Sequence, residues 1–319
     1  MSKIYGIGET VYDIIFRDGQ PQTAVPGGSA FNAIISLGRC GVHPVMTTAI
    51  GDDHIGRLTL RFMEENGVDT SAVSVNRGCR SHLSLAFLNE RNDAEYQFYK
   101  DPAHDRVDAA CPRFHAADIV LFGSFFAVNP VLRTFTRTFL SEAHAAASIL
   151  YYDVNFRASH IADLPVVMES IVENMQWATI VRGSMEDFQC LFGLDTTIPD
   201  RCQLAEHIYQ HYVSPYCPIL IVTDGAEAVH VLLPAAHFVY PVPPLHTVST
   251  VGAGDNFNAG IVYGLYHLGM TPSKLLALPE EQWKRLVALA QRFSADVCQR
   301  MSNNVSIGFA HELRGMQHG

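Results

Sequence analysis

Charge is scarce in this sequence, and most of it is negative. Only 17% of the 319 residues are charged, and the formal net charge at pH 7 is -10. No run of Lys and Arg occurs, so the chain is a poor candidate for binding nucleic acid or an anionic membrane surface. The few charged residues are interspersed, which argues against extended disorder.

Cysteine is present without a pattern that would suggest a scaffold. The seven cysteines are odd in number and contain no Cys-x-x-Cys pair. Buried reduced thiols therefore fit better than a disulfide framework or a zinc site. Met1–Glu9 has no apolar signal-peptide core, and prolines interrupt the uncharged stretch Val229–Gly254, which disfavours a spanning helix. We expect a soluble, cytoplasmic protein.

Several familiar nucleotide and metal motifs are also missing. The sequence has no Gly-Lys-Ser or Gly-Lys-Thr, so it lacks a Walker-type phosphate loop. Its fifteen histidines form no His-Glu-x-x-His motif, which leaves metal-dependent hydrolysis unsupported. Gly6-Ile7-Gly8 follows the first apolar run, but Glu9–Val11 does not complete a dinucleotide-binding fingerprint.

What the sequence does contain is a regular alternation of short apolar runs and longer amphipathic segments, with enough hydrophobic residues (48%) for a large core. The apolar runs predict strands at Ile4–Gly8, Val45–Gly51, Ile119–Gly123, Ile149–Asp153, Ala178–Val181 and Ile219–Thr223. The amphipathic segments predict helices at Ser29–Arg39, Asp53–Asn66, Pro130–Ala147, Pro165–Trp177 and Leu204–Tyr212. This alternation predicts an α/β fold, a mainly parallel sheet covered by helices on both faces.

Two segments break the alternation. Tyr12–Thr23 has no helical pattern, and Ser81–Lys100 has the period-two alternation of a hairpin around a polar turn at Arg91–Ala94. We expect a small antiparallel sheet, inserted into the core, that would suit a lid. No internal repeat is evident, and no linker separates independent domains.

The segment Ser249–Gly260 carries the strongest chemical signal. Gly252, Ala253 and Gly254 leave backbone N–H groups accessible at the positive end of a predicted helix, which favours an anion such as phosphate. Asp255 follows directly and can accept a proton from an attacking hydroxyl. Taken alone, these four residues would suit an ordinary capped helix start.

A second glycine-rich segment, Gly27-Gly28-Ser29-Ala30-Phe31-Asn32, opens the first predicted helix. Its double glycine lets the backbone approach a ligand closely. A polyol pocket needs acceptors such as Asp13 and groups that both donate and accept, such as Asn32. Singly, Asp13 could be a turn residue and Asn32 a solvated helix residue.

Together the two segments resemble the signatures of the ribokinase-like carbohydrate kinases, the PfkB family. Ser249–Asp255 is similar to Asp-Thr-x-Gly-Ala-Gly-Asp, and Gly27–Asn32 to Gly-Gly-x-x-x-Asn, in the family's order. The resemblance covers nearly the whole chain. It implies a ribokinase-like three-layer α/β/α sandwich, with one kinase domain over 1–319 and lid segments at about 10–24 and 79–103.

The resemblance also implies ATP-dependent phosphorylation of a sugar hydroxyl. The final strand of the predicted lid, Tyr96–Lys100, resembles that of fructokinase-like members, so fructose or a related sugar or sugar acid is the expected acceptor. The implied roles are as follows: catalytic, Asp255 as base with Gly252, Ala253 and Gly254 as anion hole; substrate-binding, Asp13, Gly28, Asn32 and Arg157; nucleotide-binding, Thr223, Gly225, Gly252 and Gly254.

The chain departs from the family pattern in two places. Ser249 stands where the family usually has Asp, and its neutral hydroxyl is a weaker cation ligand, so dependence on a monovalent cation stays open. ATP and Mg²⁺ are the implied cofactors. Ser184-x-x-Asp187 stands where the family has Asn-x-x-Glu, which makes Asp187 the candidate for ordering the water shell of the magnesium ion.

Two alternative functions remain: a kinase-fold sugar-binding sensor with weak or no turnover, and a nucleoside kinase. The expected partners are a small-molecule sugar and ATP, with no nucleic acid and no membrane. We also expect a homodimer, because lid sheets with open edges often pair.

Overall fold

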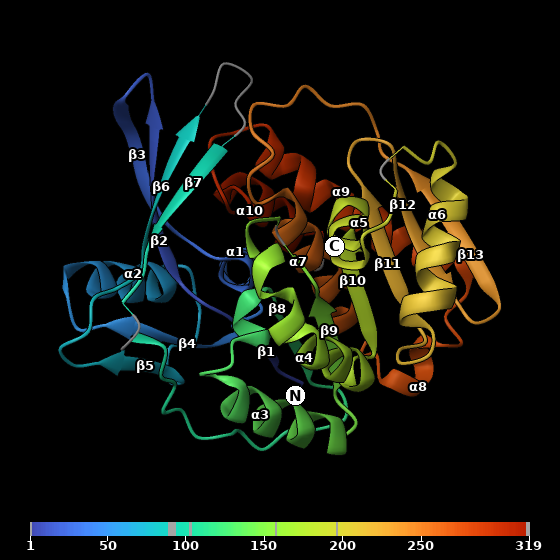
Figure 1. Ribbon diagram of the computed structural model, residues 1–319, viewed down its shortest axis with the longest axis horizontal. Helices are drawn as coiled ribbons and strands as arrows, with labels where there is room; N and C mark the ends of the chain where they lie inside the picture. Colours follow the sequence, from blue (N-terminus) through green and yellow to red (C-terminus); the bar gives the residue numbers. More distant parts are fainter. Residues whose placement is uncertain (1, 89–93, 102–103, 157, 196, 317–319) are drawn as a thin grey trace. The chain divides into compact units, whose positions relative to one another are not determined.

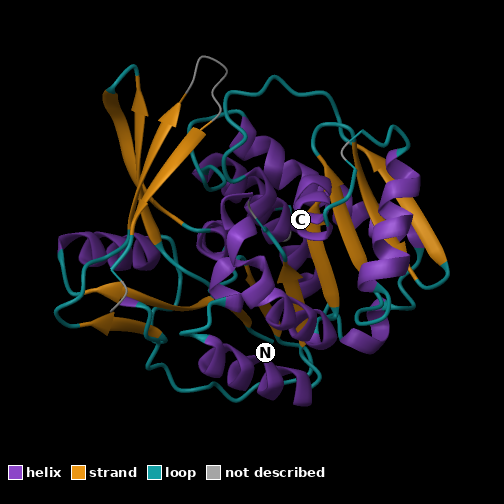
Figure 2. Cartoon of the chain, viewed as in Figure 1, coloured by secondary structure: helices purple, strands orange, loops and turns teal. Residues whose placement is uncertain are grey.

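The structure is a computed structural model that describes residues 2–88, 94–101, 104–156, 158–195 and 197–316. The chain divides into two compact units. The first comprises Met1–Ile4, Cys111–Leu245 and Gly260–Phe293, and the second comprises Tyr5–Ala110, His246–Ala259 and Ser294–Gly319. Each unit is built around strands with helices beside them (Figures 1 and 2).

The first unit contains a mixed sheet. Its parallel strands, in spatial order, are β8 (Ile119–Gly123), β9 (Ile149–Asp153), β10 (Ile180–Ser184) and β11 (Leu220–Asp224). Two antiparallel strands, β12 (Ala228–Leu233) and β13 (Ala236–Pro241), continue it. Strands β8 and β9 are buried along their whole length, which explains why they appear in the sequence as unbroken apolar runs.

Helices accompany the strands of the first unit. They are α3 (Arg133–Ala145), α4 (Leu164–Trp177), α5 (Met185–Phe192), α6 (Arg201–Ile208) and α8 (Pro272–Leu275), with parts of α7 (Ala253–His267) and α9 (Glu280–Cys298). Short helical segments lie at η2 (Phe125–Val128), η3 (Ala158–Asp163) and η4 (Tyr209–Val213). Helix α5 starts abruptly at the end of β10 because Ser184 and Asp187 form a capping box.

The second unit contains the parallel strands β4 (Val45–Gly51) and β5 (Val73–Asn76), and β1 (Ile4–Ile7) from its second residue onward. Its helices include α1 (Ser29–Arg39), α2 (His54–Glu65) and α10 (Ile307–Gly315). Helix α1 is buried nearly all round, so its polar residues face protein rather than water. That burial places Asn32 and Ser36 inside the unit.

A smaller sheet belongs to the second unit. Its described strands lie in the order β3 (Gln20–Gly27), β2 (Val11–Arg17), β6 (Leu83–Leu88) and β7 (Ala94–Tyr99) (Figure 1). β2 pairs antiparallel with β3, and β6 pairs antiparallel with β7, but β2 and β6 run parallel. The sheet is thus two hairpins side by side, and its register places Asp13 opposite Ser84.

These observations confirm the predicted fold class, a large, mostly parallel sheet with a smaller, mostly antiparallel one. The bounds of α1, β4, β8 and β9 are those expected from the sequence. Strand β10 begins two residues and ends three residues later than the predicted Ala178–Val181. The antiparallel pair β12–β13 was not expected, because most of its residues belong to one uncharged stretch broken by prolines. Within the described residues, no helix is both long and apolar enough to cross a membrane. The predicted turn at 91–94 lies mostly outside the described residues.

Candidate active site

The start of α7 is shaped by a tight approach of two backbone segments. Gly252 has φ +79°, and a Cβ atom there would meet the Asn303 carbonyl oxygen at 3.0 Å. The Ala253 amide donates to the Thr250 carbonyl at 3.1 Å, which closes the turn that leads into the helix. The following first-turn amides have no intrahelical acceptor, and the helix dipole makes this end positive. The positive φ and the nearby Asn303 backbone therefore already favour glycine at 252, before any ligand is considered.

A buried asparagine fixes this turn to the rest of the second unit. Asn256 donates through Nδ2 to the carbonyl oxygens of Gly252 and Asn303, each at 2.8 Å. Its Oδ1 accepts the Ser36 hydroxyl at 2.5 Å. These bonds satisfy a side chain that is fully buried. They hold the glycine turn in one position, as a preorganised anion site requires.

Asp255 lies in the first turn of α7 and meets Asn32 of α1. The Asn32 Nδ2 group donates to Asp255 Oδ2 at 2.8 Å, although the two residues are 223 positions apart in sequence. Asn32 is buried, and its backbone carbonyl accepts from Asn304 Nδ2 at 3.2 Å. Its Oδ1 atom has no hydrogen-bond partner among the described residues. This contact brings the two sequence signatures together.

Asp13 of β2 is a second carboxylate in this unit. The Ser84 hydroxyl donates to Asp13 Oδ1, and a Cβ atom at Gly27 would meet Asp13 Oδ2 at 2.3 Å. Burial raises the pKa of Asp13 to about 6; the Ser84 hydrogen bond opposes the rise, and the negative charges of Asp255 and Glu9 add to it. The Asp13 carboxylate is therefore within electrostatic range of Asp255.

The second glycine of the pair also has a steric role. Gly28 caps α1 with φ +130°, and a Cβ atom there would meet the Glu9 carbonyl oxygen at 2.3 Å. The Glu9 side chain pairs with Lys100 at 3.0 Å. A Cβ atom at either glycine would therefore collide with other atoms: at Gly27 with the Asp13 side chain, and at Gly28 with the Glu9 backbone.

The first unit holds two of the four residues predicted to bind nucleotide, Thr223 and Gly225. Arg182 is buried and donates through Nη1 to Asp153 Oδ1 at 2.9 Å and through Nη2 to the Thr223 hydroxyl at 2.8 Å. Gly225 follows β11 with φ +53° and has open space where a Cβ atom would lie. The buried Asp153–Arg182 pair fixes the Thr223 side chain at the end of its strand.

Comparison with known proteins decides the family. The profile of the pfkB family carbohydrate kinases matches residues 1–307. The chain belongs to the pfkB family of carbohydrate kinases. A curated relative, fructokinase from Escherichia coli, is 26% identical over 298 residues and covers 92% of each chain.

Solved structures confirm the fold of this carbohydrate kinase. Fructokinase from Vibrio cholerae O395 in its fructose, ADP and calcium ion bound form matches with a TM-score of 0.81 at 19% identity, covering 98% of this chain and 99% of the other. Aminoimidazole riboside kinase from Salmonella enterica, complexed with aminoimidazole riboside and an ATP analog, matches with a TM-score of 0.79 at 20% identity, also covering 98% and 99%.

The structure shows the hydrogen bonds of Asp187 and Ser249, which mark the two departures from the family signatures. Asp187 is buried, which raises its pKa, and its Oδ2 atom accepts from the Ser184 amide at 2.8 Å and the Ser184 hydroxyl at 2.7 Å. That carboxylate therefore serves the cap of α5. Ser249 is nearly buried, and its hydroxyl oxygen accepts from the Val251 amide at 3.2 Å.

The predicted site residues of this pfkB kinase fall into three sets. The second unit holds Asp13, Gly28, Asn32, Gly252, Ala253, Gly254 and Asp255. The first unit holds Thr223, Gly225 and Asp187, and Arg157 lies outside the described residues. Sequence reasoning missed Ser84 and Asn256. Ser84 could have been noticed as a polar residue on the inward face of an alternating strand, but nothing in the sequence pointed to Asn256.

Proposed function

We propose that this kinase transfers the γ-phosphoryl group of ATP to a hydroxyl of fructose or a closely related sugar, with Asp255 as the base. The observation that carries the proposal is the 2.8 Å hydrogen bond from Asn32 Nδ2 to Asp255 Oδ2. It orients a carboxylate at the start of α7, beside backbone amides suited to phosphate. Asp13, whose pKa responds to the charge of Asp255, supplies a second polar group.

The sugar would bind to the polar groups around Asp13. A sugar hydroxyl can donate to the Asp13 carboxylate, and it can also donate to Asn32 Oδ1, which is buried and has no partner among the described residues. Binding would then satisfy an acceptor whose desolvation is otherwise uncompensated. The absence of side chains at Gly27 and Gly28 keeps the backbone close to these groups.

The transferred phosphoryl would lie against the turn before Asp255. Because the Ala253 amide already donates to Thr250, the donors of the proposed anion hole are the amides of Gly252 and Gly254. These groups stabilise negative charge that develops on the equatorial oxygens of the phosphoryl. Thr223 and Gly225 are the proposed nucleotide-binding residues, and Arg157 is a proposed phosphate ligand.

In the proposed reaction, an oxygen–phosphorus bond forms between the sugar hydroxyl and the γ-phosphorus. The bond from that phosphorus to the bridging oxygen of ADP breaks, and the hydroxyl proton moves to Asp255. Magnesium bound to the nucleotide would neutralise charge on the phosphates. Mg²⁺ keeps several waters and binds mainly through substrate phosphates, so Asp187 would act on its water shell through Oδ1, since Oδ2 serves the cap.

The smaller sheet is proposed as a lid over the sugar, formed by segments at about 10–24 and 79–103. Closure would exclude water, so the sugar hydroxyl rather than water would attack. We also propose a homodimer in which this sheet takes part, since Phe87, Phe98 and Tyr99 are exposed on it. Light scattering across a concentration series tests the dimer; a monomer at all concentrations would exclude it.

A substrate panel with an isosteric variant tests the central proposal. We expect ATP consumption with fructose or a related sugar, and a fall in kcat of about 10²–10⁴-fold in Asp255→Asn. Sugar affinity measured by calorimetry should change only a few-fold, because Asn keeps an oxygen that can accept from Asn32. As a control, Asp52→Asn removes a carboxylate that is 48% exposed and should keep the wild-type kcat. Undiminished turnover by Asp255→Asn would rule out the assigned base.

The same panel decides between substrates. The similarity to Salmonella aminoimidazole riboside kinase makes a nucleoside the second candidate acceptor. Phosphorylation of a riboside with higher kcat/KM than any hexose would favour it. A sensor would bind a sugar but consume no ATP with any acceptor, and its binding would be unchanged in Asp255→Asn.

A further inference from the structure

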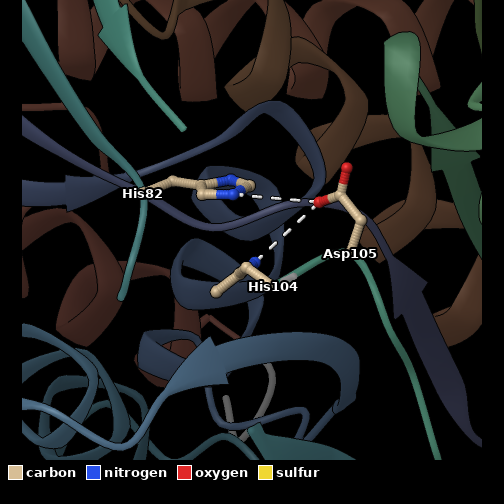
Figure 3. A group of neighbouring side chains, drawn as sticks. All are labelled: His82, His104 and Asp105. Atoms are coloured by element: carbon tan, nitrogen blue, oxygen red, sulfur yellow. Dashed lines mark ion pairs between the residues drawn. The ribbon is translucent and has the colours of Figure 1, made fainter. Parts of the chain in front are cut away.

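Two histidines and an aspartate converge near the base of the smaller sheet, within the second unit (Figure 3). His82 directly precedes β6, and His104 and Asp105 lie in the segment after β7. One potential ligand atom from each residue lies within 4.8 Å of the other two. Asp105 Oδ1 is 3.8 Å from His82 Nε2 and 3.9 Å from His104 Nδ1. These three side chains have no part in the proposed phosphoryl transfer.

Both imidazole rings are buried without a full set of hydrogen bonds. His82 is 2% exposed and His104 is 3% exposed, and their ring centroids are 4.0 Å apart. His82 Nε2 lies 3.3 Å from the Asp101 carbonyl oxygen. Over the described parts of the chain, His82 Nδ1 and His104 Nε2 have no hydrogen-bond partner; these are the ring nitrogens other than the two measured to Asp105. Because buried polar atoms are normally satisfied, hydrophobic packing alone does not account for this pair.

The backbone at these residues is held by hydrogen bonds that do not involve the three proposed ligand side chains. Asn76 is buried and donates through Nδ2 to the carbonyl oxygens of His104 and Arg106, both at 2.9 Å, so it anchors the chain on either side of Asp105. The His82 carbonyl accepts from the Tyr12 amide at 2.9 Å. The cluster thus has a rigid framework, which is what positions ligands for a metal.

We propose that His82, His104 and Asp105 form a binding site for a divalent first-row transition ion, with Zn²⁺ as the best fit. Two imidazoles and one carboxylate are a common zinc ligand set that leaves one position for water. Tetrahedral bonds of about 2.0–2.1 Å place ligand atoms about 3.3–3.4 Å apart. The two Asp105 distances therefore need to shorten by about half an ångström, and the two imidazole ligand atoms, which lie within 4.8 Å of each other, by up to about 1.5 Å. Side-chain rotation on binding would have to supply these changes.

A bound ion would join two parts of the smaller sheet. His82 directly precedes the strand that carries Ser84, whose hydroxyl donates to Asp13, and the other two ligands follow the strand that pairs with it. The site would stabilise the base of this hairpin. Magnesium does not compete, because imidazole ligands suit zinc, copper, nickel and iron rather than Mg²⁺. Binding needs neither sugar nor turnover, so its test is independent of the proposed function.

Calorimetric titration of the chelator-treated full chain with ZnCl₂, in excess Mg²⁺, tests the site. We expect one equivalent bound by the wild type and at least about tenfold weaker binding by His104→Gln and by Asp105→Asn. The matched control is His311→Gln, which removes an exposed imidazole from α10 and should bind zinc as the wild type does. With Co²⁺, the wild type should give the visible absorption of a four-coordinate ion, and His104→Gln should not.

Melting curves separate loss of the site from loss of the fold. In chelator, the variants should melt cooperatively within a few degrees of the wild type, and added zinc should raise the midpoint of the wild type and of His311→Gln only. If His104→Gln does not fold, Asp105→Asn and His82→Gln carry the test. Absence of saturable zinc binding by the wild type, or equal binding by all variants, would overturn the proposal.

Discussion

Replacing Asp13 by Asn should make this kinase more stable at neutral pH while damaging sugar binding. The pKa of Asp13 is raised from 3.8 to about 6, mainly by burial. A shift of about two units corresponds to ~3 kcal/mol of unfolding free energy. Asn keeps the shape of the side chain, and its Oδ1 atom can still accept the Ser84 hydroxyl. The substitution therefore removes the cost of a buried charge with little change in packing.

The sign of the effect fixes its pH dependence. Because the pKa is raised in the folded state, the native protein holds the Asp13 proton more tightly than the unfolded chain. The wild type has its full stability below about pH 4 and loses up to ~3 kcal/mol as the pH rises through about 6. The advantage of Asp13→Asn should thus be near zero at pH 4, grow between pH 4 and 6, and stay constant above.

Urea unfolding of both proteins across pH 4–8 measures this difference, and steady-state kinetics at pH 7.5 measures its functional cost. A carboxylate that accepts sugar hydroxyls is worth ~1.5–3 kcal/mol per bond, so KM for the sugar should rise at least about tenfold. Asp52→Asn is the control, because its exposed carboxylate should change unfolding free energy by less than ~0.5 kcal/mol. A variant less stable than the wild type at pH 7.5, or a pH-independent difference, would refute the reasoning.

Three further outcomes follow from the same structure. Gly252→Ala should lower the melting temperature and kcat more than Gly19→Ala does; both glycines have positive φ, but only at Gly252 does an added Cβ atom meet other atoms. Arg182→Met should lower stability by ~3–5 kcal/mol, seen as a lower melting temperature, because it removes the cation that faces buried Asp153. Ser249→Asp should confer activation by K⁺, measured as the ratio of kcat with and without the ion, since a carboxylate binds a cation better than a hydroxyl does; an unchanged ratio would contradict this.

Local sequence patterns were sufficient for the elements whose burial is uniform. Strands β8 and β9 are buried along their whole length, so each has an unbroken apolar run with breakers at both ends. Helix α1 is bounded by glycine and by a basic last turn, and its limits were predicted to the residue. Strands β12 and β13 escaped detection because their alternation merges with a long uncharged stretch, and β13 ends at Pro241.

The residues of the candidate site also fall into two groups, those that the sequence revealed and those that only the structure revealed. Gly27, Gly28, Asn32 and the Gly252–Asp255 turn were recognisable from sequence, because backbone conformation and close approach restrict those positions to few residue types. The roles of Ser84 and Asn256 were not, because a serine or an asparagine has no spacing signature until its partner is known. Likewise, the pKa of Asp13 depends on burial and on neighbouring charges, and neither exists in the linear chain.

By itself, then, the sequence determined the fold class, the family signatures and the identity of the candidate base, since these depend on periodicity and on residues close together in the chain. Only the tertiary structure decided that Asn32 holds Asp255, that Ser84 holds Asp13, and that His82 meets His104 and Asp105. Hydrogen bonding and ion binding act over a few ångströms in space, so residues far apart in the chain acquire these roles only once folding has brought them together.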